Sequence, residues 1–212
     1  YWGGNARGSG GQNTSGPSVV YSSPVQIPGT WSDFGSMSYA SIGLKTNGTL
    51  WSWGYNSHGT LGQNNTTSYS SPVQIPGTTW RSISSRNYYQ GMATKTDGTL
   101  WMWGYNQTGR LGQNNTTTYS SPRQIPGTNW GTEHMTGYNS SGAIKTDGTL
   151  WMWGNNQYGV GAQNNQVDYS SPVQIPGTTW KSFSLNSFLN NGNTTVLATK
   201  TNGTLWAWGS NS

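Results

Sequence analysis

The stretch KTDGTLWMWG, residues Lys95–Gly104, decides the fold because it is one of four near-identical copies in the chain. The other copies occupy residues 45–54, 145–154 and 200–209. Each copy places an Asn-Gly or Asp-Gly pair between a polar strand end and an aromatic-rich strand. This pattern predicts a two-residue β-hairpin with a type I′ turn, because Asn or Asp followed by Gly best tolerates the positive φ that both central residues need. The chain is therefore predicted to repeat one hairpin unit.

Three further pieces recur between the hairpins. A loop that begins WG-x-N, as at Trp53–Asn56, precedes the segment YSSPVQIPG, as at Tyr69–Gly77, and a Trp follows. The third copy of the segment has Arg123 in place of Val. Proline on both sides of Val-Gln-Ile predicts a short strand bounded by the two prolines. The hairpin leucines are 50, 50 and 55 residues apart, and the extra residues lie in 185–195.

This period predicts the fold class. No segment shows helical periodicity over the length that a helix needs. A unit of about 50 residues with several short strands predicts an all-β fold, which is a β-propeller or an open propeller-like array of four repeats with little or no helix. We predict one domain over residues 1–212, with repeats at about 1–50, 51–100, 101–150 and 151–205 and with residues 206–212 starting or closing a further repeat.

The recurring pieces resemble the repeat of the regulator of chromosome condensation family, which combines a WG.N..G.LG loop, a P..I strand, a Trp and a K.DG.LW.WG hairpin. The Asn- and Thr-rich sequence of these repeats is similar to that of repeat arrays from bacteria and bacteriophages. The resemblance implies a β-propeller, commonly with seven blades, whereas four repeats are visible here. A closed four-bladed ring, part of a larger ring, and an open array that pairs with other chains all fit the sequence. Because the chain opens at Tyr1-Trp2 without Met, we expect a processed form or a fragment of a longer protein.

Composition argues against several classes of function. Charged residues make up 7% of the chain, and the net charge of +5 includes no basic run, so we expect no nucleic-acid partner. The absence of cysteine rules out disulfides and thiolate chemistry. No apolar run has the length of a membrane span, so we expect no membrane insertion.

Residues suited to catalysis or metal binding are sparse. The acidic residues are scattered, and the hairpin positions of Asp97 and Asp147 carry Asn in the other copies, which suits a turn and not an acid or base. His58 and His134 lack a second ligand at metal-binding spacing, and Glu133-His134 is interpreted as a solvated pair in a loop. We predict that the protein is not an enzyme and has no cofactor and no metal site.

Residues that recur at the same position of every repeat are interpreted as scaffold. All 13 tryptophans fall in three such positions, which indicates packing between blades. The repeated Gln-Asn-Asn loop, as at Gln63–Asn65, offers amides for sugar hydroxyls, but its place in the repeat favours hydrogen bonds to nearby backbone.

A binding site is expected where the repeats differ from one another. The stretches before the hairpins differ most, at residues 36–41, 85–90, 136–141 and 185–195. Equivalent loops of a propeller gather on one rim, and these loops carry aromatic and hydrogen-bonding side chains typical of recognition surfaces. The predicted ligand- or partner-binding residues are Arg86, Tyr88, Tyr89, Tyr138, Asn139 and Phe188. Neutral variation of exposed loops is the alternative explanation.

These observations predict a non-enzymatic structural or binding propeller of an extracellular fibre, an appendage or a phage virion. It would act by self-association, by contact with other virion or surface proteins, or by recognition of surface glycans. The alternative is an intracellular propeller resembling a small-GTPase nucleotide-exchange factor, which needs a protruding element that the sequence lacks beyond residues 185–195. A glycosidase would need two carboxylates about 5–10 Å apart, which five scattered acids do not suggest.

Overall fold

The computed structural model describes residues 3–37, 39–84, 89–187 and 194–210. The regular elements in these ranges are β-strands, and they form antiparallel sheets. The predicted all-β fold with little or no helix is therefore confirmed. Within the described ranges, no helix has the length and apolar character needed to cross a membrane.

Three sheets have four strands each, and every strand in them pairs with its neighbour in the chain. Blade 1 contains β3 (Trp31–Ser36), β4 (Ala40–Lys45), β5 (Leu50–Gly54) and β6 (Tyr69–Ile75). Blade 2 contains β7 (Trp80–Ile83), β8 (Gln90–Lys95), β9 (Leu100–Gly104) and β10 (Tyr119–Gln124). Blade 3 contains β11 (Trp130–Thr136), β12 (Ser140–Lys145), β13 (Leu150–Gly154) and β14 (Tyr169–Gln174).

The two ends of the chain form smaller sheets. Blade 4 has three strands, which are β15 (Trp180–Ser187), β16 (Thr194–Lys200) and β17 (Leu205–Gly209). At the other end, β1 (Gly3–Gly4) and β2 (Val20–Tyr21) pair only with each other. Within the described ranges, three complete blades thus lie between two partial ones.

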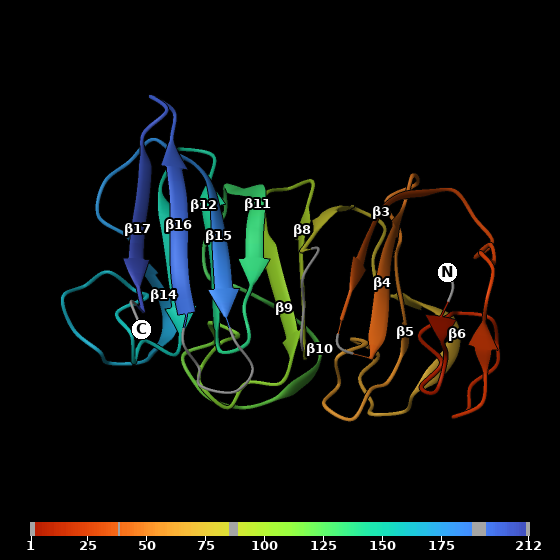
Figure 1. The fold of residues 1–212 in the computed structure, drawn as a ribbon. Helices are drawn as coiled ribbons and strands as arrows, with labels where there is room; N and C mark the ends of the chain where they lie inside the picture. The colour runs from red at the N-terminus through yellow and green to blue at the C-terminus, as the bar shows by residue number, and fades with distance from the viewer. Residues whose placement is uncertain (1–2, 38, 85–88, 188–193, 211–212) are drawn as a thin grey trace.

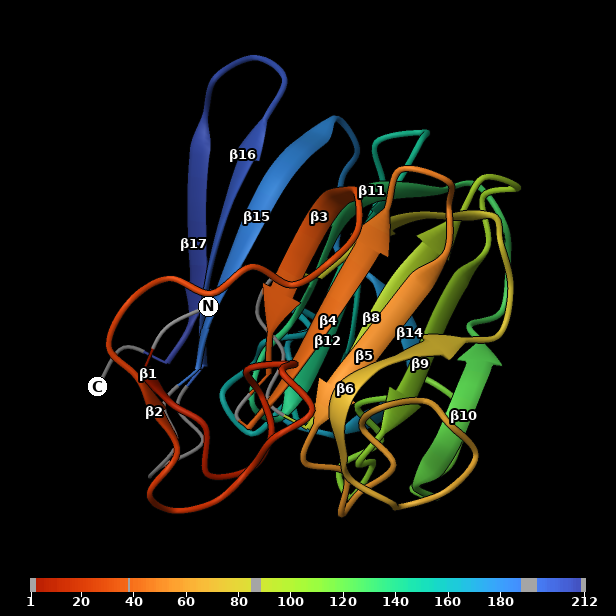
Figure 2. The same cartoon turned by 90° about the vertical axis from the view of Figure 1, so that its right-hand side faces the viewer.

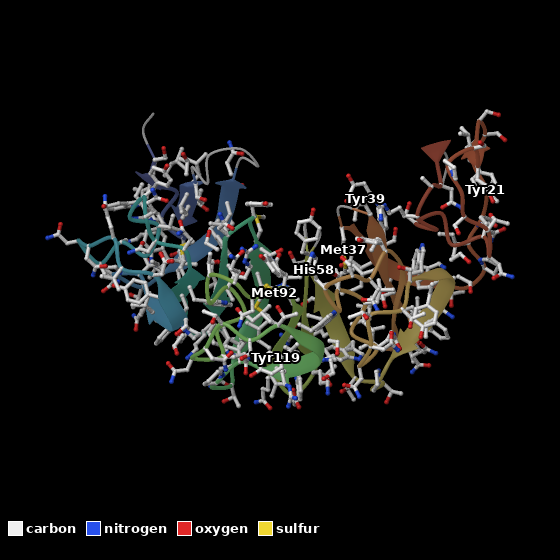
Figure 3. The ribbon with its side chains drawn as sticks, turned by 90° about the horizontal axis from the view of Figure 1, so that it is seen from below. Tyr21, Met37, Tyr39, His58, Met92 and Tyr119 are labelled. Carbon is white, nitrogen blue, oxygen red and sulfur yellow. The ribbon has the colours of Figure 1, made fainter. Side chains whose placement is uncertain are left out.

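The blades follow one another along an arc, from the red N-terminal end to the blue C-terminal end (Figures 1 and 3). Neighbouring blades pack on each other, since β7 contacts β3 and β4, β11 contacts β7 and β8, and β15 contacts β11 and β12. Figure 2, which views the N-terminal end, shows the strands of blade 1 in front of those of blade 2. Blades 1 and 4 lie toward opposite ends of the arc, so the fold is an open propeller and not a closed four-bladed ring (Figure 1).

The hairpin turns differ from the predicted type I′ turn. In blade 2 the Lys95 amide donates to the Thr99 carbonyl oxygen at 2.9 Å, and the Gly98 amide donates to the Lys95 carbonyl oxygen at 3.1 Å. These bonds enclose a three-residue loop in which only Gly98 has a positive φ, of 79°. Hydrogen bonds from the Thr99 hydroxyl and amide, at 2.6 and 3.0 Å, hold the pKa of Asp97 below its usual value. The two-residue turn is therefore wrong, and Asp or Asn occupies this position as a hydrogen-bond acceptor.

The outer strands are longer than the sequence predicts. β6 runs from Tyr69 to Ile75 and so includes Pro72, which the sequence predicts at the boundary of the strand. The strand tolerates this proline because β6 is the edge strand of its sheet. The register of its pairing with β5 also shifts between Ser52 and Gly54. This irregularity interrupts the hydrogen-bond ladder near the proline, which has no N–H to donate.

Tryptophans of the third strand in each blade join that blade to the loop before it. The Trp103 indole N–H donates to the Thr60 carbonyl oxygen at 2.8 Å, across the boundary between blades 1 and 2. Trp103 is fully buried and packs on Trp80 with the ring centroids 6.2 Å apart. The same indole bond recurs at the other three boundaries, from Trp53 to Ser9, from Trp153 to Arg110 and from Trp208 to Val160. The predicted packing role is confirmed for these tryptophans.

The repeated lysine of the hairpin lies over two tryptophan rings in every blade. Lys95 Nζ is 4.2 Å from the ring centroid of Trp101 and 4.8 Å from that of Trp80. Equivalent stacks form at Lys45, Lys145 and Lys200. Because these cation–π contacts recur in each repeat, much of the positive charge of the chain lies in contacts that stabilise the blades.

His134 is buried between blades 2 and 3, which corrects its interpretation as part of a solvated loop pair. It lies in β11 and is 7% exposed, while Glu133 beside it is exposed. Its Nε2 shares a hydrogen bond of 2.8 Å with the Ser82 hydroxyl of blade 2. Burial first, and the charge of Arg81 second, lower the pKa of His134 from 6.5 to about 4. Strand alternation buries this position, because Ile83 and Phe183 occupy it in blades 2 and 4.

This burial predicts an acid-dependent loss of stability. Since the folded state binds the His134 proton more weakly than the unfolded state, its stabilisation is complete above pH 6.5 and disappears as the pH falls to about 4. The expected loss is about 3 kcal/mol. Urea unfolding at several pH values measures it, with His134→Phe as the matched control because Phe183 fills the equivalent position. An unchanged pH dependence in His134→Phe would contradict the assignment.

Candidate binding surface

The loops before the second strand and after the third strand of each blade meet at one edge of the sheets. Gln90 pairs with Gly104 at this edge in blade 2, and equivalent pairs form in blades 1 and 3. Figure 3 views the arc from this side, opposite the hairpin turns. We define the loop rim as Arg7, Tyr39, Tyr55, His58, Tyr89, Tyr105, Arg110, Tyr138 and Asn139.

The first cluster of the loop rim joins the N-terminal loop to blade 1. The guanidinium carbon of Arg7 lies 4.2 Å from the ring centroid of Tyr55 and 5.1 Å from that of Tyr39. The two phenol rings meet edge to face, 6.3 Å apart. A hydrogen bond from Ser57 and the charge of Arg7 lower the pKa of Tyr55. Arg7 is exposed and Tyr39 is 50% exposed, so the cluster presents an aromatic face to solvent.

The second cluster repeats this arrangement between blades 1 and 2. The His58 ring lies 4.8 Å from the ring of Tyr105 and 5.4 Å from that of Tyr89. Tyr89 and Tyr105 also meet edge to face, at 6.4 Å. In the repeat, these three residues take the places of Arg7, Tyr39 and Tyr55. Figure 3 shows Tyr39 and His58 toward the concave side of the arc.

Arg110 extends the second cluster to blade 3. Its guanidinium carbon lies 5.0 Å from the Tyr105 ring centroid and 5.8 Å from that of Tyr138. It donates to the Tyr138 carbonyl oxygen and, at 2.8 Å, to the Asn139 side-chain oxygen. Burial lowers the pKa of Arg110 to about 10, so the group remains cationic at neutral pH. Arg110 is 2% exposed and these partners are neutral, so it is a buried positive charge within the loop rim.

At the boundary between blades 2 and 3, polar side chains take two of the places that aromatic or imidazole side chains have at the boundary before it. Thr108 takes the place of His58, and its hydroxyl donates to the Asn139 carbonyl oxygen at 3.0 Å. Asn155 takes the place of Tyr105, and its side-chain amide donates to Asp168 at 3.2 Å. Around Arg110, the loop rim is therefore richer in hydroxyl and amide groups at this boundary than at the boundary before it.

The structure brings together half of the predicted binding residues. Tyr89 lies in the second cluster, and Tyr138 and Asn139 both contact Arg110. Arg86, Tyr88 and Phe188 lie outside the described residues. Sequence reasoning missed the loop-rim residues that follow each WG pair, including Arg7, His58, Tyr105 and Arg110. A comparison of the four copies at those loop positions would have found them, because Arg7, His58, Thr108 and Tyr158 align at one of them.

The repeated Gln-Asn-Asn loop has the structural role that its sequence favours. Gln63 donates through its side-chain amide to the Gln74 carbonyl oxygen at 3.1 Å. Asn65 donates to the Tyr69 hydroxyl at 3.2 Å, and Asn64 has a φ of 56°. These amides are engaged within the blade, so the loop is a weaker candidate for sugar binding than the loop rim.

The chemistry of the loop rim suits non-covalent recognition. It offers partly exposed tyrosine faces, the exposed Arg7, an imidazole and an amide, with the buried Arg110 beneath them. Within the described ranges, no three His, Asp or Glu side chains are grouped so that they could hold a metal ion.

Comparison with protein families matches residues 47–85 and 97–143 to the regulator of chromosome condensation (RCC1) repeat. These two stretches are therefore similar to the RCC1 repeat, and the four-stranded blades show a β-propeller-like fold. No curated protein sequence matches the chain.

Two solved structures show the same fold. Human WBSCR16 has 19% sequence identity and a TM-score of 0.79, over 97% of this chain and 55% of its own. Prp20p of Saccharomyces cerevisiae, whose structure is described together with its binding to Gsp1p and histones, has 18% identity and a TM-score of 0.76, over 99% of this chain and 52% of its own. The chain therefore spans about half the length of these structures, and at such identities the likeness shows the fold alone.

Proposed function

We propose that this chain is a non-enzymatic binding propeller whose loop rim recognises polysaccharides on a cell surface. The observation that carries the proposal is the repeated cluster of one cationic or imidazole side chain between two tyrosines, at two successive blade boundaries. Tyrosine supplies a rigid contact face at low entropic cost, which makes it a common recognition residue.

Exposure and charge support a sugar ligand. The tyrosines of the loop rim are partly exposed. The scaffold therefore holds their rings in place while part of each ring reaches solvent. The exposed Arg7 and the half-buried Asn139 amide supply hydrogen-bonding groups beside those rings. Stacking of a sugar ring on a tyrosine, with hydroxyls or acidic groups bonded to these side chains, is the binding mode that we propose.

Composition supports a place outside the cell. Only 7% of the residues are charged, and a surface rich in Asn, Gln, Ser and Thr suits an extracellular fibre, an appendage or a phage virion. In such an assembly the propeller would present the loop rim to the cell surface, as an adhesion or decoration module.

The test is binding of the 212-residue chain to an array of bacterial capsular and lipopolysaccharide glycans. We expect Tyr105→Ala, which removes the ring between His58 and Arg110, to weaken retention at least tenfold, or about 1.4 kcal/mol. Arg7→Ala is expected to weaken it as well. Arg123→Ala is the matched control, because Arg123 also lies over a tyrosine, Tyr119, but on an outer strand.

Equal losses in Arg7→Ala and Arg123→Ala would place binding elsewhere than the loop rim. If no glycan is retained and the chain instead accelerates nucleotide release from a small GTPase, the exchange-factor alternative holds. That alternative rests at present on the fold shared with Prp20p.

A further inference from the structure

We infer that the polysaccharide recognised by the loop rim is anionic and carries carboxylates, as polymers of uronic acids do. The inference rests on the proposed function, because it names the class of glycan that the same surface would select. What carries it is the charge of the two clusters in the loop rim, which contain two arginines and no acidic residue.

Four of the five acidic residues lie in or near the hairpin turns, on the side opposite the loop rim. Asp97 and Asp147 belong to the turns themselves, where each accepts a hydrogen bond from a threonine. Asp33 pairs with Leu44 near the hairpin end of β4. The register of β11 with β12 puts Glu133 in the same half of its strand. These carboxylates are therefore separated from the loop rim by the length of a blade.

The fifth acidic residue, Asp168, lies on the loop side of the molecule but belongs to blade 3. Its carboxylate accepts from the Asn156 backbone amide at 2.7 Å and from the Asn155 side-chain amide at 3.2 Å. It is thus engaged within its own blade. The positive charges of the two clusters have no acidic residue beside them that could take the place of an anionic ligand.

Arg7 is the exposed cation of the loop rim. Its guanidinium carbon lies 4.2 Å from the ring centroid of Tyr55, so an aromatic face supports it. A guanidinium presents its N–H groups in one plane, which fits the two oxygens of a carboxylate. A sugar ring stacked on Tyr39, which is 50% exposed, would bring such a carboxylate within reach of Arg7.

The repeat position of Arg7 stays open to solvent between complete blades. His58 occupies this position at the boundary between blades 1 and 2, both of which have four strands. His58 is still partly exposed there, and two tyrosines flank it as two tyrosines flank Arg7. The exposure of Arg7 is therefore a property of the repeat and does not depend on where the sequence starts.

Arg110 adds a positive charge beneath the second cluster. It is 2% exposed and donates to the Thr108 hydroxyl at 3.2 Å, to the Tyr138 carbonyl oxygen and, at 2.8 Å, to the Asn139 side-chain oxygen. All three partners are neutral. Because little water surrounds the guanidinium, its charge is weakly screened and its field extends to the surface of the loop rim. Arg110 is thus a positioning residue, which holds Tyr138 and Asn139 and attracts an anionic polymer without contacting it.

The test measures retention of the 212-residue chain on alginate, polygalacturonate and hyaluronan, each used in its native form and after reduction of its carboxyl groups to alcohols. The reduction removes the charge and leaves the sugar backbone and its linkages in place. We expect at least one native polymer to retain the chain about tenfold or more tightly than its reduced form. Added salt is expected to weaken retention on the native form only.

Two charge-removing variants separate recognition at the loop rim from attraction by the net charge of the chain. Arg7→Gln replaces an exposed side chain, so it is expected to fold like the wild type by circular dichroism. It is expected to lose most of the difference between native and reduced polymers. Arg123→Gln removes the same charge from an arginine that also lies over a tyrosine, but on an outer strand, and is expected to bind like the wild type.

A third variant tests the inference by gain of binding. His58→Arg places at the second cluster the side chain that the same repeat position already carries as Arg7. Tyr89 and Tyr105 flank it there as Tyr39 and Tyr55 flank Arg7. This variant is expected to strengthen retention on the native polymers and to leave retention on the reduced polymers unchanged.

The outcomes separate this inference from the proposed function. Equal retention on native and reduced polymers would overturn the inference and leave the proposed function standing, as would retention on neutral glycans of the array alone. Equal losses in Arg7→Gln and Arg123→Gln would also overturn the inference, because they would show attraction by net charge. Retention on no glycan of either kind would overturn the proposed function, and the inference with it.

Discussion

Replacing Trp103 with alanine is expected to lower the free energy of unfolding by about 3–5 kcal/mol, the range for removing a large aromatic side chain from a core. Trp103 is fully buried, and its indole N–H holds the Thr60 carbonyl oxygen of the previous loop at 2.8 Å. The substitution therefore opens a cavity and leaves a buried carbonyl without its donor. Urea unfolding followed by circular dichroism measures the change.

Trp208→Ala is the matched control for this prediction. Trp208 makes the same bond, to Val160 at 2.7 Å, but it lies half-buried at the end of the arc. Its loss is expected to cost clearly less than the loss of Trp103. Equal losses in the free energy of unfolding at the two positions would show that burial between two blades adds nothing to the stabilisation by this tryptophan.

Replacing Asn106 with alanine is expected to cost about 3–4 kcal/mol, because this fully buried side chain makes three hydrogen bonds that are lost at once. The Asn106 side-chain oxygen accepts from the Leu111 amide at 2.8 Å. Its amide donates to the carbonyl oxygens of Asn115 and Thr117 at 3.0 and 2.9 Å. The side chain thus closes the loop between β9 and β10 from within, which explains why the WG pair is followed two residues later by Asn in every copy.

The Asn106→Asp variant distinguishes the bond that the side-chain oxygen accepts from the bonds that the side-chain amide donates. The carboxylate keeps the bond from Leu111 but faces two carbonyl oxygens, so it is expected to destabilise the fold nearly as much as alanine does. Thermal unfolding of both variants measures the effect. A change below about 1 kcal/mol in either variant would contradict a closing role for this residue.

The scaffold could be predicted from the sequence because its structural elements repeat. The hairpin, the tryptophan positions and the outer-strand sequence recur at a fixed spacing, and the structure uses each of them in every complete blade. The turn type could not be predicted from Asp-Gly alone. The Thr two residues after Asp97 offers the carboxylate two donors, which favours a three-residue loop over the type I′ turn.

The loop rim could be predicted only in part, because its clusters join residues from different repeats. His58 meets Tyr89 and Tyr105 only when blade 1 packs on blade 2, and no local pattern encodes that contact. The burial of His134 could not be predicted for the same reason, since it follows from packing against the neighbouring blade and not from the polar residues beside it in the sequence. The open arc was one of three arrangements that the repeat allows, and packing alone selects among them.

The most direct test of the proposed function is hydrogen exchange of the 212-residue chain with and without the polysaccharide that the array retains most tightly. Recognition by the loop rim predicts slower exchange in residues 55–60, 105–110 and 138–140. The hairpin turns at residues 45–50 and 95–100 lie on the opposite side and are expected to exchange at the same rate in both samples. Protection of the hairpin turns without protection of the loop rim would contradict the account.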